Sequence, residues 1–112
     1  MKVKERLVEY FVASNGKVPV KEWLSSIKDP LTQAILYKRI RQAADGNFGD
    51  SKTVGSGVFE MRINYGSGYR IYYGIHKDEV ILLLVGGSKR TQSSDIEKAK
   101  IFWMKFKENQ NG

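Results

Sequence analysis

The alternation of hydrophobic and polar positions predicts a strand and two helices in the first half of the chain. The segment "ERLVEYFV", residues 5–12, predicts an opening strand. Hydrophobic residues at helical spacing follow, first over a short helix at 19–27 and then over a longer helix that ends at about Ala44. The longer helix begins at Asp29 and Pro30, because aspartate caps free amide groups and proline fits the first helical position.

The second half of the chain reads as a β-meander followed by a helix. Residues 45–57 are polar and rich in glycine, and they predict a long connection. Three strands with short turns are then predicted at 58–64, 69–76 and 80–86, and the last of these has no polar face, so we expect it to be covered on both sides. A final helix starts at about Ser94 and carries one hydrophobic face, made of Ile96, Ala99, Trp103 and Phe106. The order β-α-α-β-β-β-α predicts an α+β fold with helices packed on an antiparallel sheet.

The composition is typical of one globular domain without disulfide bonds. At 112 residues, with 41% hydrophobic and 28% charged residues, the chain can bury one core but not two. It has no cysteine, no signal-peptide pattern at its start, and no apolar run near the ~20 residues of a membrane span. We therefore expect a single cytoplasmic domain over 1–112 with no membrane partner.

The net charge favours partners that are negatively charged. Nineteen Lys and Arg residues against twelve Asp and Glu residues give a net charge of +7. Such an excess is typical of proteins that bind nucleic acid, and it also suits a protein partner with an acidic surface. Both kinds of partner stay open on charge alone.

The hydrophobic pattern of two neighbouring strands restricts how they pair. In "VFEMRIN" (58–64) and "YRIYYGIH" (69–76), hydrophobic residues fall on alternate positions, and a slip by one residue would exchange the faces of a strand. The tightest register in which the hydrophobic faces coincide uses a turn at 65–67 with a left-handed glycine, for which Gly66 and Gly68 are candidates. This register pairs Phe59 with Tyr73, Glu60 with Tyr72, Met61 with Ile71, and Arg62 with Arg70.

Two arginines directly opposite each other repel, so the pair of Arg62 and Arg70 requires compensation. Glu60 can lie diagonally between them as a salt-bridge partner, or a phosphate can bind over both guanidinium groups. The two interpretations are compatible, since a salt bridge at rest can give way to a phosphate. In a meander the segment "GGSKRTQ" (86–92) ends near the start of the strand that carries Arg70. Lys89 then either joins the arginines or stays in a solvated basic turn.

The segment "VFEMRINYGSGYRIYYGIHKDEVILLLVGGSKRTQSSDIEKA", residues 58–99, resembles the core of the RelE/HigB superfamily of bacterial toxins. It is most similar to the branch of addiction-module killer proteins, or phage-derived HigB-like toxins. The Gly-Tyr-Arg run at 68–70, the strand after it and "LLLVGGSKRTQ" carry this likeness. The first half resembles the helical pair of the family more loosely, so the likeness covers nearly the whole chain.

This resemblance implies a microbial-ribonuclease-like sheet and the toxin of a type II toxin–antitoxin system. Such toxins cleave mRNA in the decoding site of the ribosome and are inhibited by an antitoxin, which in this branch is usually a helix-turn-helix DNA-binding protein. By position, the phosphate-contacting arginine of the family corresponds to Arg70, and the arginine of the preceding strand to Arg62. The basic residue after the central strand corresponds to Lys89 or Arg90. Glu60 stands where some relatives carry a catalytic side chain.

Cleavage of this kind needs a base for the 2′-hydroxyl, stabilisation of the phosphorane-like charge, and an acid for the leaving 5′-oxygen. Arg62 and Arg70 suit the second role, because arginine does not give up its proton. Glu60 is a candidate base, and Lys89 is a candidate acid or base. The expected RNA-binding residues are Arg90, Tyr72, Lys52 and Gln92.

Three further residues bear on the proton transfers. Tyr72 shares the face of Arg70, where it can stack on a base or donate a proton. His76 has a suitable unperturbed pKa. However, it follows Arg70 by six residues, roughly 20 Å along a strand, and we interpret it as a surface residue beside a turn. Gln92 opens the last helix, and no Tyr or His follows His76. Better-studied relatives carry one near the C-terminus, so the acid and the base stay open.

Two other functions compete with mRNA cleavage. A toxin on the same fold can inhibit DNA gyrase, in which case the cationic positions would be lost, but this sequence keeps Arg62, Arg70 and Lys89. A non-catalytic RNA-binding or partner-binding relative is the other alternative. We expect no metal and no cofactor, because one histidine and no cysteine leave only carboxylates without ligand-like spacing.

Overall fold

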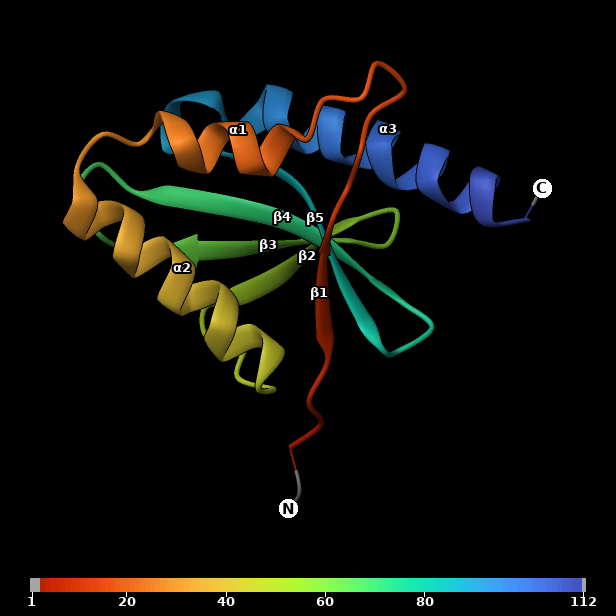
Figure 1. Cartoon of the computed structure of the whole chain (residues 1–112), viewed down its shortest axis with the longest axis horizontal. Coiled ribbons are helices and arrows are strands. Elements are labelled where there is room, and N and C mark those ends of the chain that lie inside the picture. Colours follow the sequence, from red (N-terminus) through yellow and green to blue (C-terminus); the bar gives the residue numbers. More distant parts are fainter. Residues whose placement is uncertain (1–2, 112) are drawn as a thin grey trace.

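The computed structural model describes residues 3–111, which form a five-stranded sheet with three α-helices packed on it (Figure 1). The predicted α+β fold is confirmed. The elements are, in chain order, β1 (Leu7–Tyr10), α1 (Pro19–Ser26), α2 (Pro30–Ala44), β2 (Ser51–Gly55), β3 (Val58–Ile63), β4 (Tyr69–His76), β5 (Val80–Ser88), the short 3-10 helix η1 (Lys89–Thr91) and α3 (Gln92–Asn111).

The strands lie in the order β1-β5-β4-β3-β2. From β5 to β2 the sheet is antiparallel, as predicted, whereas the edge strand β1 runs parallel to β5 and pairs Leu7 with Val80. The prediction did not include this parallel pair. The pattern of a short edge strand sets its inward face but not its direction relative to a strand far along the chain.

The prediction of an unpaired connection over 45–57 is wrong, because the segment contains β2. This strand pairs with β3, with Lys52 opposite Glu60. It is short and polar, only Val54 in it packs against the core, and a register shift interrupts it before Gly55. Its two β-branched residues, Thr53 and Val54, are adjacent, so the strand lacks the alternation of hydrophobic and polar positions that marks a strand in a sequence.

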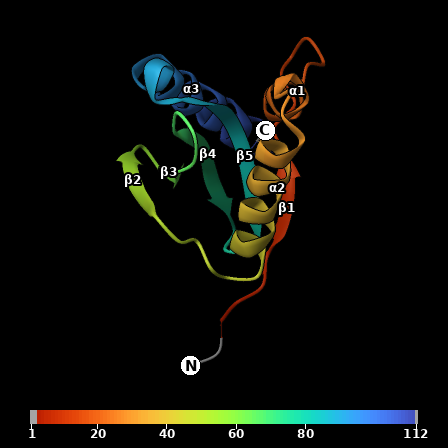
Figure 2. The same ribbon diagram turned by 90° about the vertical axis from the view of Figure 1, so that its left-hand side faces the viewer.

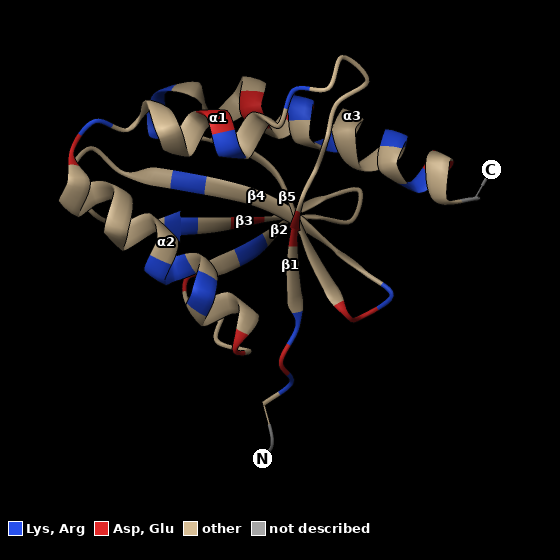
Figure 3. Cartoon of the chain, viewed as in Figure 1, with Lys and Arg blue, Asp and Glu red and all other residues tan. Residues whose placement is uncertain are grey.

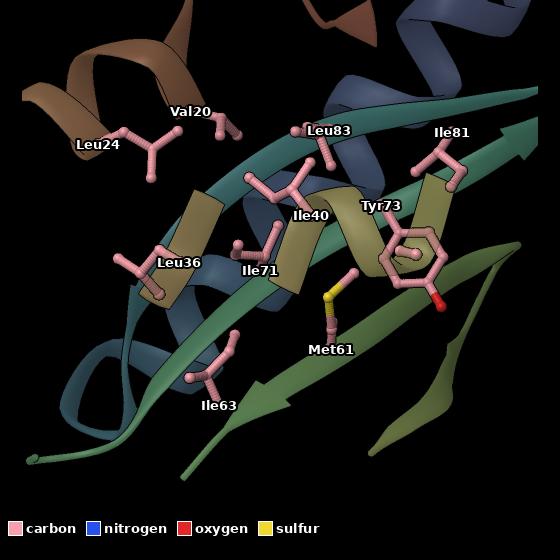
Figure 4. Packing of buried hydrophobic residues seen from close by; sticks show 11 residues of the cluster. Val20, Leu24, Leu36, Ile40, Met61, Ile63, Ile71, Tyr73, Ile81 and Leu83 are labelled. Atoms are coloured by element: carbon pink, nitrogen blue, oxygen red, sulfur yellow. The ribbon is translucent and has the colours of Figure 1, made fainter. Parts of the chain in front are cut away.

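Two hydrophobic layers cover the two faces of the sheet, which Figure 2 shows nearly edge-on between α3 and the pair α1 and α2. The layer under α1 and α2 is built from both helices and from β3, β4 and β5 (Figure 4); it includes Val20, Leu24, Leu36, Ile40, Met61, Ile71, Tyr73 and Leu83. The layer under α3 includes Tyr72, Leu82, Leu84, Ala99 and Trp103. Strand β5 contributes to both layers, as expected for a strand without a polar face.

The boundaries of the two long helices follow local signals. Asp29 caps α2, where its carboxylate accepts hydrogen bonds from the amide groups of Leu31 and Thr32, as predicted. Helix α3 begins at Gln92, two residues before the expected start at Ser94, because η1 leads directly into it. Within residues 3–111, no helix has the length and apolar character needed to cross a membrane.

The register of β3 and β4 is the predicted one, with Phe59 opposite Tyr73 and Arg62 opposite Arg70. Both candidate glycines of the turn, Gly66 and Gly68, have positive φ angles of 58° and 88°. Helix α3 packs mainly on β5 and β4. The part of this face over β2, β3 and the start of β4 is therefore less covered, and it carries the predicted site.

Candidate functional site

The arginine pair lies in the middle of the less covered part of the sheet. Arg62 and Arg70 face each other across β3 and β4 on the side of α3, and Lys52 lies on β2, one strand further out. Figure 3 shows these basic segments of β2, β3 and β4 side by side on the same half of the sheet. The alternation of the strands fixes this face, because the neighbouring positions Met61 and Ile71 point into the opposite layer.

Glu60 lies between the arginines and the core, and it is 0% exposed. Its Oε2 atom is 3.5 Å from Nε of Arg70, which agrees for this arginine with the salt bridge that was one of the two interpretations of the register. The same oxygen accepts hydrogen bonds from the hydroxyl of Tyr72 at 3.1 Å and from Nε2 of Gln92 at 2.7 Å. Glu60 thus compensates Arg70 but does not bridge to Arg62.

Arg62 has a carboxylate of its own. Its Nη2 atom is 3.0 Å from Oδ1 of Asp50, in the residues just before β2, and its backbone amide donates to the carbonyl oxygen of Asp50. Sequence reasoning missed Asp50 because it read this segment as an unpaired loop. The sequence offers one signal, an acidic residue two positions before Lys52. This spacing puts Asp50 and Lys52 on one face only if the segment is a strand, which the sequence did not indicate.

Tyr72 lies on the predicted face but is fully buried, so its ring is not available to stack on a base as we expected. Helix α3 covers the ring, which packs with Ala99 and Trp103. Burial, followed by the negative charge of Glu60, raises the pKa of Tyr72 above its usual value. Its hydroxyl therefore stays protonated at neutral pH and donates to Glu60.

The remaining basic positions lie around the arginine pair. Gly87 of β5 pairs with Arg70, and the chain then enters η1, where Lys89 and Arg90 are exposed. The predicted approach of the end of β5 to the start of β4 is therefore confirmed at the level of the backbone. Lys52 is exposed opposite the buried Glu60.

His76 and Asp95 lie apart from the arginine pair. His76 is at the far end of β4, where its ring packs edge-on against Phe106 at 5.0 Å between centroids. Asp95 is buried in the first turn of α3 and accepts a hydrogen bond from the hydroxyl of Thr91. Within residues 3–111, no group of three or more His, Cys, Asp or Glu side chains is arranged to hold a metal ion.

The arrangement suits the recognition of a phosphate. The guanidinium groups of Arg62 and Arg70 offer several donors on adjacent strands. Lys52, exposed on β2, and Lys89, exposed in η1, add positive charge on the neighbouring segments. A phosphate bound there would compete with the exposed carboxylate of Asp50 for Arg62. Charge stabilisation of this kind is what phosphoryl chemistry requires from a protein.

Comparisons with known proteins agree with this description. The sequence profile of the family described as "Phage derived protein Gp49-like (DUF891)" matches residues 22–103. This family is toxin-like and of the RelE/HigB type. An uncharacterized protein from Haemophilus influenzae is 44% identical to the chain over 79 residues, which cover 70% of this chain and 80% of that relative. The candidate site residues, from Asp50 to Gln92, all lie within the matched segment.

Proposed function

Because the chain belongs to the family of phage-derived Gp49-like proteins, which is toxin-like and of the RelE/HigB type, we propose that it is the toxin of a type II toxin–antitoxin system. It acts in the cytoplasm as a ribosome-dependent endonuclease that cleaves mRNA and thereby inhibits translation. Its partners are the ribosome with its message and a cognate antitoxin of the helix-turn-helix class.

The observation that carries this proposal is the opposed pair of Arg62 and Arg70 on a less covered face of the sheet. Two like charges on adjacent strands are unfavourable, and in the free protein Glu60 and Asp50 offset the repulsion. Asp50 is exposed, so a phosphodiester can replace it and bind over both arginines with matching geometry. The net charge of +7 favours the approach of RNA to the whole molecule.

The basic residues and Gln92 have distinct roles in the proposed reaction. The 2′-oxygen of the RNA bonds to phosphorus while its proton passes to a water molecule, and the bond from phosphorus to the 5′-oxygen breaks. Arg70 and Arg62 stabilise the charge that develops on the phosphate oxygens. Lys89, exposed in η1, donates the proton that the leaving 5′-oxygen takes up. Lys52, Arg90 and Gln92 contact the flanking nucleotides.

Message integrity in a reconstituted translation reaction tests this function. The protein should shorten the message, and Arg70→Ala should lower the cleavage rate by about 10²–10³-fold, the cost of removing one donor to a developing charge. Arg41→Ala is the matched control, because it removes an exposed arginine from α2 on the opposite side of the sheet. It should cleave like the parent protein.

An intact message in the presence of folded protein would contradict the proposal. Inhibition of DNA supercoiling by gyrase under the same conditions would then favour the gyrase-directed alternative. Equal loss of cleavage in Arg41→Ala and Arg70→Ala would also count against it, since net charge rather than the arginine pair would then be responsible.

A further inference from the structure

Glu60 is an unusual carboxylate because it lies in the middle of a basic surface and has no exposed surface of its own. It sits on β3, opposite Tyr72 of β4 and opposite Lys52 of β2. One of its carboxylate oxygens, Oε2, contacts Tyr72 at 3.1 Å, Gln92 at 2.7 Å and Arg70 at 3.5 Å, whereas Oε1 is buried without a hydrogen bond. These contacts come from β4 and from the first residue of α3.

This burial argues against proton abstraction from a substrate by Glu60. A general base must come within hydrogen-bond reach of the proton that it removes, about 2.6–3.2 Å between heavy atoms. Glu60 is 0% exposed, and Tyr72 and Gln92 occupy the oxygen that points toward Arg70. Glu60, the base that the sequence suggested, therefore cannot reach a 2′-hydroxyl unless the start of α3 is displaced.

The geometry of Arg70 explains what the carboxylate does instead. The side chain of Arg70 is only 12% exposed, and its Nε atom is buried beside Oε2 of Glu60, at ion-pair distance and without a hydrogen bond to it. The terminal nitrogens of the guanidinium group are the part left to contact a ligand. A planar guanidinium whose Nε faces a fixed carboxylate has its orientation restricted, and its fork then points in one direction.

We infer that Glu60 is a positioning residue that orients Arg70 toward the phosphate and ties the start of α3 to the sheet through Gln92. Its role in cleavage rests on the proposed function, whereas its control of the Arg70 side chain does not. The hydroxyl of Tyr72 donates a hydrogen bond to Glu60 from the core side. Because the pKa of Tyr72 is raised, this hydroxyl keeps its proton and remains a donor. Gln92 closes the carboxylate off from solvent at the surface.

Nuclear magnetic resonance of the arginine Nε–H groups tests the positioning in the free protein. The Arg70 signal is assigned by its loss in Arg70→Lys. In Glu60→Gln, exchange of this proton with water should accelerate by about tenfold, because a charge-assisted contact is replaced by a neutral one. Asp50→Asn is the matched control: it removes the carboxylate that faces Arg62, and it should leave the Arg70 signal unchanged.

Two milder variants keep the test informative if Glu60→Gln does not fold. Tyr72→Phe and Gln92→Ala each remove one donor to the same oxygen and leave Glu60 in place. Both should shift the Arg70 Nε–H signal and accelerate its exchange, while Ser93→Ala, exposed one residue further along α3, should not. An unchanged Arg70 signal in the folded variants would overturn the inference.

The pH profile of cleavage separates positioning from catalysis. A positioning role predicts that Glu60→Gln lowers the rate by about tenfold while the rate keeps its dependence on pH. A general base would instead cost about 10²–10⁴-fold and remove one limb of the profile, which would overturn the inference. If the parent protein cleaves no message at all, the proposed function fails, and the Arg70 signal alone decides whether Glu60 positions that side chain.

Discussion

At the scale of single residues, each arginine of the pair has its own carboxylate, and the two carboxylates differ in accessibility. Glu60 is 0% exposed beside Arg70, whereas Asp50 is 43% exposed beside Arg62, which is itself 36% exposed. A phosphate can displace an exposed partner much more easily than a buried one, because the exposed carboxylate regains its hydration in water. We therefore expect Arg62 to exchange partners when a phosphate binds, and Arg70 to stay held by Glu60.

Asp50→Asn should increase RNA binding and cleavage. The substitution removes a charge that competes with the phosphate for Arg62, and exposed ion pairs are worth at most about 1 kcal/mol, so we expect an increase of up to about fivefold. Asp45→Asn makes the same change in net charge at an exposed position after α2 and should have a smaller effect. Dissociation constants for a short RNA, measured with both variants, check this; weaker binding in Asp50→Asn would show that Asp50 positions Arg62 instead.

The pairing of these residues was predictable from the sequence, but their burial was not. Hydrophobic alternation in β3 and β4 was sufficient to place Arg62 opposite Arg70 and Glu60 opposite Tyr72. Whether Glu60 and Tyr72 meet solvent depends on α3, whose first residue, Gln92, reaches Glu60 across 32 positions of the chain. Local patterns carry no information about a contact of that separation.

At the scale of elements, the junction of β5 with α3 holds the basic turn beside the arginines. Gly87 pairs with Arg70, and Thr91 of η1 and Asp95 of α3 lie directly against Gly87. A methyl group at Gly87 would overlap with Oδ2 of Asp95 and lie 2.8 Å from the hydroxyl oxygen of Thr91. This glycine is needed for close approach, because η1 can follow the strand so tightly only where no side chain intervenes.

Gly87→Ala should therefore destabilise the protein by about 1–3 kcal/mol, the usual cost of forcing extra atoms into a packed site. It should also lower cleavage, since Lys89 and Gln92 move with the turn. Urea denaturation gives the free energy of unfolding, and Ser93→Ala serves as the control, with an expected change within about 0.5 kcal/mol. Unchanged stability in Gly87→Ala would mean that α3 does not pack on Gly87 in solution.

Elements with strong local signals were predictable, and the element that depends on its neighbour was not. Helix α2 has a capping aspartate and a proline at its start, so both its presence and its N-terminus followed from the sequence. Strand β2 has only Val54 as a hydrophobic residue that packs against the core, and pairing with β3 stabilises it. Asp50 comes just before this strand, so the sequence did not indicate its ion pair with Arg62. Lys52 was expected to bind RNA, but its position opposite Glu60 was not predicted.

At the scale of the whole molecule, the N-terminal segment is tied to the turn between β4 and β5. Asp78 in this turn accepts from Lys4 at 2.8 Å and from Arg6 at 2.7 Å. The hydrogen bond from Lys4, followed by that from Arg6, lowers the pKa of Asp78 to about 2. These contacts add to the parallel pairing of β1 with β5, which begins at the next residue, Leu7.

This pKa predicts the sign of a pH effect. A carboxylate whose pKa is lowered by folding stabilises the protein above its unfolded pKa of about 3.9, and the effect is lost as the pH falls toward the folded value. Asp78→Asn should therefore melt below the parent protein at pH 6, and the difference should close between about pH 4 and pH 2. Melting temperatures measured between pH 6 and pH 2, with Asp45→Asn as the control, check this prediction. If the melting temperature of Asp78→Asn stays below that of the parent protein at pH 2, the ion pairs of Asp78 are not the cause of the difference.

The central claim is that the less covered sheet face with Arg62 and Arg70 cleaves mRNA on the ribosome. The most direct test is to map new mRNA ends at nucleotide resolution in a reconstituted translation reaction, beside naked RNA and beside Arg70→Ala. We predict new 3′ ends inside the codon in the ribosomal A site, absent with naked RNA and with Arg70→Ala. Uncleaved message, or the same ends with Arg70→Ala, would contradict the account.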